Sequence, residues 1–140
     1  MKFCLIIIAA LMFAACVGEK STPTATFKAT TEAAKNKDVN AIKANLSKGS
    51  IEFLNKAAEI QKIQLDEAIT NQLNLVNFGD KQIETRNETI NGDDATLEIK
   101  NPITGTWDKL YFTQENERWK IAFDKLFNEM MKKFEEQNAK

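Results

Sequence analysis

Histidine is absent from the 140-residue chain, and cysteine occurs only twice. Histidine is the commonest general base and metal ligand near neutral pH, so its absence removes the usual acid–base and zinc sites. Cys4 and Cys16 both lie near the start of the chain, and the remainder has no thiol that could act as a nucleophile or close a disulfide. The sequence therefore predicts no catalytic residue, no metal site and no cofactor.

Grouped glycines and excess charge are also missing. The five glycines stand singly, so no glycine-rich loop can bind phosphate through its backbone amides. A formal net charge of −1 gives none of the basic surface that nucleic acid requires. We therefore predict that the protein is not an enzyme and has no nucleic-acid partner.

The first fifteen residues form a short apolar segment. Lys2 is followed by an apolar run from Phe3 to Ala15, which rises about 20 Å as a helix, whereas a hydrocarbon core is about 30 Å thick. A positive start, a short apolar run and small residues at its end are typical of a cleaved export signal. Residues 1–15 are therefore predicted to be a signal peptide.

The end of this segment, Phe13-Ala14-Ala15-Cys16, resembles the box that closes the signal peptide of a bacterial lipoprotein. The resemblance implies that Cys16 becomes the first mature residue, carries fatty acyl chains such as palmitate, and binds membrane lipid. The protein is then exported and anchored to the cell envelope, with its body in the periplasm or outside. Residues 16–22 form the lipidated cysteine and a tether, about 20 Å long at most. Two alternatives stay open: secretory cleavage that leaves Cys16 as a free thiol, and an uncleaved segment that acts as an anchor.

Helical spacing of apolar residues predicts four helices in the first half of the domain, which spans residues 23–140. Thr22 and Pro23 are typical of a helix start, and Asp38 is a second N-cap. Gly49 and Ser50 are expected to break the chain and cap the third helix. The predicted helices cover residues 23–36, 39–46, 51–64 and 67–73.

The apolar period then changes to that of strands. Asn91-Gly92-Asp93 is a strong hairpin signal, and Trp107 and Tyr111 alternate with Phe112 so that they lie on the opposite face of their strand. Asp124 is expected to cap a last helix over residues 124–138. The predicted strands cover residues 82–90, 95–99, 106–114 and 119–123. Helices and strands that are segregated along the chain predict an α+β fold, with N-terminal helices on a curved antiparallel sheet of about four strands and an extra C-terminal helix.

The segments 22–23, 36–39, 91–99 and 112–121 resemble those of the cystatin-like, nuclear-transport-factor-two-like superfamily. More narrowly, they resemble a bacterial lipoprotein family of unknown function that is related to lumazine-binding-type domains. The resemblance implies a single cone-shaped domain with its core over residues 23–123, extended by the helix at 124–138.

Three hypotheses for function follow, in order of preference. The first is a non-enzymatic binding or interaction module with a protein partner. The second is a carrier or sensor of a small apolar ligand in the cone, with Trp107, Tyr111 and Phe112 as candidate contacts. The third is an isomerase-like enzyme, which needs a buried acid beside Tyr111.

The last predicted helix carries an apolar stripe, and two roles are possible for it. Packing against the protein's own sheet is the preferred expectation, and docking of a partner is the alternative, because methionine side chains adapt to varied surfaces. The stripe consists of Phe127, Met130, Met131 and Phe134.

Overall fold

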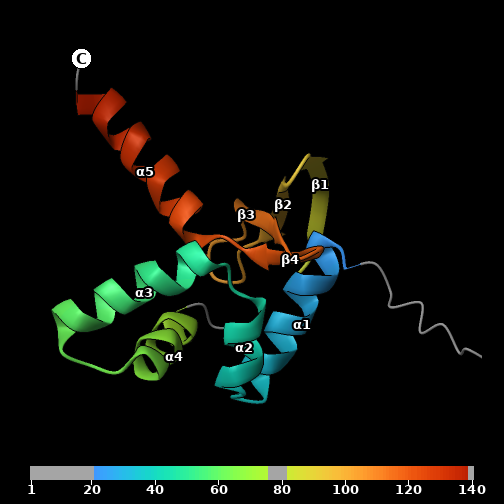
Figure 1. The fold of residues 1–140 in the computed structure, drawn as a ribbon. Helices are drawn as coiled ribbons and strands as arrows, with labels where there is room; N and C mark the ends of the chain where they lie inside the picture. The colour runs from blue at the N-terminus through green and yellow to red at the C-terminus, as the bar shows by residue number, and fades with distance from the viewer. Residues whose placement is uncertain (1–20, 76–81, 139–140) are drawn as a thin grey trace, which may run out of the picture.

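The structure is a computed structural model that describes residues 21–75 and 82–138. The predicted signal peptide and Cys16 lie outside the described residues. Within them, four helices precede a four-stranded antiparallel sheet and a fifth helix follows it (Figure 1), which confirms the α+β class. The elements are α1 (Pro23–Lys35), α2 (Val39–Asn45), α3 (Lys48–Gln61), α4 (Leu65–Leu75), β1 (Thr85–Asn91), β2 (Asp94–Lys100), β3 (Trp107–Glu115), β4 (Arg118–Ile121) and α5 (Phe123–Asn138).

The first two helices begin where their capping residues predict. Thr22 Oγ1 accepts a hydrogen bond from the N–H of Ala25 at 3.0 Å, and Pro23 occupies the first helical position. Asp38 Oδ1 accepts from the N–H of Ala41 at the same distance. Each cap satisfies a backbone donor that the helix itself leaves unpaired, and both predicted starts are confirmed.

The predicted start of the third helix is wrong. α3 begins at Lys48 with Ser47 as its N-cap, so Gly49 and Ser50 lie in its first turn and do not break the chain. Ser47 Oγ accepts from the N–H of Ser50 at 3.0 Å. The earlier start is favoured because it turns the Ser50 hydroxyl into the interior, where it forms hydrogen bonds with the backbone of Ile121 and Phe123. The fourth helix is also longer than predicted and runs from Leu65 to Leu75.

The sheet is an antiparallel meander in the order β1-β2-β3-β4. Its alternation sends Leu97, Phe112 and Ile121 to one face, where each is at most 2% exposed. The strand predicted over residues 82–90 is observed as the shorter β1, and its pairing with β2 shifts register between Arg86 and Thr89.

The helices supply the other half of the core. Side chains from α1 to α4 join those on the buried face of the sheet in one hydrophobic cluster. The central members of this cluster are Phe27, Ile42, Leu54, Ile69, Leu97, Phe112 and Ile121.

The junction between β4 and α5 departs from the prediction. Phe123 was expected to end the last strand, but it begins α5, and its N–H donates to Ser50 Oγ at 2.7 Å. Asp124 was expected to cap α5. Its Oδ1 instead lies 3.3 Å from the Oγ atoms of both Ser47 and Ser50, at the N-terminus of α3. A carboxylate is stabilised there by the partial positive charge of the helix end.

Gly49→Ala is expected to destabilise the protein because of this contact. A Cβ on Gly49 would lie 2.5 Å from Asp124 Oδ2, and overpacking of this kind costs about 1–3 kcal/mol. In an Asp124→Ala background the sign should reverse, since alanine is more favourable than glycine in a helix by roughly 0.5–1 kcal/mol. Urea unfolding of the four proteins measures the coupling. Additive effects of the two substitutions would contradict the contact.

Candidate interaction surface

The three residues predicted to contact a ligand lie on two faces of the sheet. Trp107 and Tyr111 point to the outer face, opposite Lys100 and Thr96 of β2, whereas Phe112 is fully buried beneath the helices. Tyr111 and Phe112 both border the groove described below, and Trp107 does not. The structure therefore does not bring the three into one cavity.

Trp107 is covered by charged neighbours on the outer face. The guanidinium of Arg86 lies 3.9 Å from the centroid of its ring, and Lys100 lies 5.9 Å away. Arg86 Nε also donates to Glu98 Oε2 at 2.7 Å. Hydrogen bonds from Arg86 and Asn87 hold the pKa of Glu98 below its ordinary value. Trp107 thus belongs to a polar surface cluster at this end of β3, where its ring makes a cation–π contact with Arg86.

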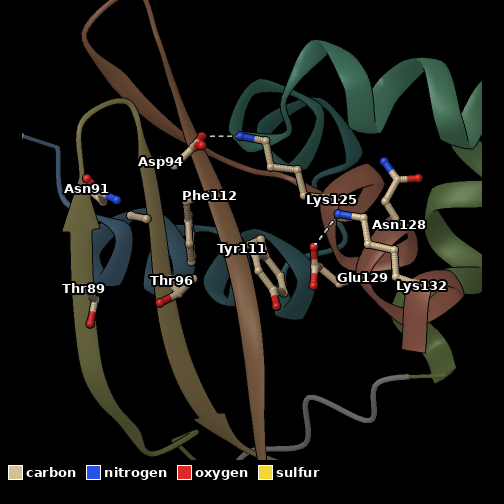
Figure 2. A pocket seen from close by; sticks show the side chains of 11 residues that line it. Thr89, Asn91, Asp94, Thr96, Tyr111, Phe112, Lys125, Asn128, Glu129 and Lys132 are labelled. Carbon is tan, nitrogen blue, oxygen red and sulfur yellow. Dashed lines mark hydrogen bonds and ion pairs between the residues drawn. The ribbon is translucent and has the colours of Figure 1, made fainter. Parts of the chain in front are cut away.

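A groove of about 480 Å³ separates the outer face of the sheet from α5 (Figure 2). Two ion pairs lie along it: Lys125 with Asp94, and Lys132 with Glu129 at 3.2 Å. Each lysine is matched by a carboxylate, so these pairs give the groove no excess of either charge. The lining residues are Thr89, Asn91, Asp94, Ala95, Thr96, Tyr111, Phe112, Lys125, Asn128, Glu129 and Lys132.

Tyr111 lies on the floor of this groove. Its pKa is raised, first by burial of the phenol and then by the charge of Glu129. The side chain of Glu129 is 41% exposed. Tyr111 and Glu129 thus do not form the buried acid–tyrosine pair that an isomerase-like mechanism needs.

The apolar stripe of α5 does not pack against the sheet, and the preferred expectation for it is wrong. Its exposed fractions are 44% for Phe127, 61% for Met130, 42% for Met131 and 61% for Phe134. No residue of α5 is buried. The polar side of the helix faces the sheet instead, through Lys125 and the other α5 residues of the groove.

A second apolar stripe lies on α3. Phe53, Ala57 and Ile60 recur at helical spacing, and Ile60 is 82% exposed. The rings of Phe53 and Phe127 meet with centroids 5.0 Å apart, and from this contact the two helices diverge (Figure 1). We call the two stripes together the α3–α5 apolar surface: Phe53, Ala57, Ile60, Phe127, Met130, Met131 and Phe134.

Comparisons with known proteins add little to this picture. No family model and no curated protein matches the chain. One solved structure that is similar is described as a "Putative NTF2-like transpeptidase" from Campylobacter jejuni. It is 16% identical, with a TM-score of 0.45 over 73% of this chain and 98% of that one. At this level of similarity it supports neither an activity nor a site for the present chain.

Two kinds of structure are missing from the described part of the chain. Across residues 21–75 and 82–138, no helix combines the length and apolarity needed to cross a membrane. Over the same residues, no three acidic side chains converge where they could hold a metal ion.

The environment of Tyr111 gives a direct test of the groove. Glu129→Gln removes the negative charge that opposes phenol ionisation, so the pKa of Tyr111 should fall toward its ordinary value. Tyr111 is the only tyrosine of the chain, so ultraviolet titration of the tyrosinate band reports it directly. Glu136→Gln, a neutralisation that touches neither the groove lining nor the apolar stripe, is the matched control. Equal shifts in the two variants would place α5 elsewhere.

Proposed function

We propose that this protein is a membrane-anchored lipoprotein whose single domain is a non-enzymatic interaction module. The partner is a protein, and the module binds it through the α3–α5 apolar surface. The observation that carries this proposal is the exposure of the α5 stripe, from Phe127 to Phe134, on a helix that buries no side chain of its own.

An exposed stripe of this kind points to a partner for two reasons. Contiguous exposed apolar patches on soluble domains mark interaction sites, because their contact with water is unfavourable. Helices in proteins also owe most of their stability to packing of their apolar face. Since α5 has its apolar face in solvent, a binding partner supplies the packing that the domain itself does not.

The lipid anchor follows from the leader segment. Cys16 follows the apolar run directly and has no disulfide partner in the mature body. Acylation gives this single thiol a role. Several acyl chains hold a protein stably, whereas a single chain binds reversibly. Because α1 begins at Pro23, the tether from Cys16 holds the domain within about 20 Å of the lipid surface.

The groove beside Tyr111 supports a second candidate function, a carrier or sensor of a small ligand. Its volume of about 480 Å³ is of the size that small molecules occupy. Its walls include Asn91, Asn128 and Thr96, whose amides and hydroxyl favour a polar ligand over an apolar one. The groove is preferred over the interior of the fold, where Phe112 and the other core residues form one buried hydrophobic cluster.

Cys16→Ser is expected to abolish labelling with a fatty-acid analogue and to release the protein from the membrane fraction, because serine offers no thiol to acylate. Cys4→Ser is the matched control. Cys4 lies inside the predicted signal peptide, so its loss should leave both labelling and fractionation unchanged. Retention of both properties by the Cys16→Ser protein would remove the anchor from the proposal.

The interaction surface is tested by photo-crosslinking in intact cells. Benzoylphenylalanine at position 134, which is on the exposed stripe, should give a discrete crosslinked adduct. The same group at Lys132, which lines the groove on the polar side of α5, should give at least about ten-fold less. Equal yields at the two positions, or no adduct at either, would contradict binding through the apolar stripe.

A further inference from the structure

The two sides of α5 have opposite relations to the rest of the molecule. Lys125 and Glu129 border the groove and face the sheet (Figure 2). The stripe that begins at Phe127 and ends at Phe134 points away from the sheet. The ion pair between Lys125 and Asp94 joins this side of the helix to β2. The apolar side of α5 is thus presented outward by contacts within the domain.

The stripe reads the same in both directions along the helix. Phe127, Met130, Met131 and Phe134 are symmetric about the midpoint between the two methionines. A two-fold axis through that midpoint sets Phe127 of one copy against Phe134 of another, and Met130 against Met131. A surface that pairs with itself in this way meets the condition for an isologous dimer interface, in which one patch serves both subunits.

The residues beside the stripe agree with an antiparallel pair. Asn128 and Glu135 lie on the same flank of α5, on opposite sides of the midpoint. In the antiparallel arrangement Asn128 of one copy and Glu135 of the other lie on the same side of the interface, about 3 Å apart along the helix axes, so an amide donor is within side-chain reach of a charged acceptor. A hydrogen bond to a charged group contributes more than one between neutral groups.

The position of α5 in the fold also selects the antiparallel direction. The rest of the domain is joined to the N-terminal end of α5, and the C-terminal half of α5 extends away from it (Figure 1). A parallel pair would bring two domains to the same end. An antiparallel pair places them at opposite ends and carries Phe134 of each copy toward the contact between Phe53 and Phe127 of the other.

We propose that the partner bound by the α3–α5 apolar surface is a second copy of this chain, paired through α5 in the antiparallel direction. This inference rests on the proposed function, which it deepens by naming the partner. Each copy places the α5 stripe of the other against its own, in the space between the diverging α3 and α5.

Sedimentation of the full-length protein in detergent tests the dimer. The parent should sediment as two copies per particle. Phe134→Glu should weaken the association at least about a hundred-fold, since two large apolar side chains leave the interface of each dimer. Phe134 is 61% exposed in a single copy, so the substitution should leave the circular dichroism spectrum unchanged. Glu136→Gln, on the opposite side of α5, is the control. A monomeric parent would overturn the inference.

Cysteine crosslinking tests the direction. Positions 131 of the two copies are offset by about 1.5 Å along the paired helices, whereas positions 134 are offset by about 10 Å, beyond disulfide reach. Met131→Cys should therefore crosslink to itself, and Phe134→Cys should do so at least about ten-fold less. A mixture of Phe127→Cys and Phe134→Cys chains should crosslink to each other. The yields compared are those of the crosslinked dimer, after subtraction of the background that the native Cys4 and Cys16 give in the parent protein.

The outcomes separate this inference from the proposed function. Self-crosslinking of Phe134→Cys as strong as that of Met131→Cys would overturn the antiparallel direction. A photo-crosslinked adduct at position 134 whose mass differs from two copies would overturn the second copy as partner, while interaction through the stripe would stand. Absence of any adduct, together with a monomeric parent, would overturn both.

Discussion

The hydroxyl of Ser50 connects the elements on which the arrangement of this domain depends. It is fully buried, donates to the carbonyl of Ile121 at 2.8 Å, and accepts from the N–H of Phe123 at 2.7 Å. The N–H of Ser47 donates to the same carbonyl at 2.9 Å. One serine thus satisfies polar groups at the end of β4 and the start of α5 from within the first turn of α3, which fixes where α5 leaves the sheet.

The positions of the groove and of the α3–α5 apolar surface follow from that departure point. Asp124 continues the junction by placing its carboxylate at the N-terminus of α3, and Gly49 leaves the space that this carboxylate occupies. Lys125, the next residue, then pairs with Asp94 on β2. These contacts orient the first turn of α5, so its polar side forms one wall of the groove and its apolar side faces outward. The groove and the apolar surface are the two sides of one helix.

Local chemistry in the sequence accounts for much of the fold. Thr22 and Asp38 mark helix starts because each capping side chain accepts a hydrogen bond from a backbone N–H three residues later. Alternation identifies Leu97 and Phe112 as core residues because successive side chains of a strand point to opposite faces of the sheet. The start of α3 and the orientation of α5 depend on Ser50, whose partners are about 70 residues away in the chain. Periodicity shows that a helix has an apolar side, but buried and exposed stripes such as the one at Phe127 have the same spacing.

The proposed anchor and the proposed pair constrain each other geometrically. Two copies related by a two-fold axis insert their anchors into the same bilayer only when that axis lies along the membrane normal. The axis of an antiparallel pair is perpendicular to both helices, so each α5 then lies parallel to the lipid surface. Confinement by a tether of about 20 Å also raises the effective concentration of the copies. Pairing through the four apolar side chains from Phe127 to Phe134 is therefore stronger between copies anchored in one bilayer than between unanchored copies.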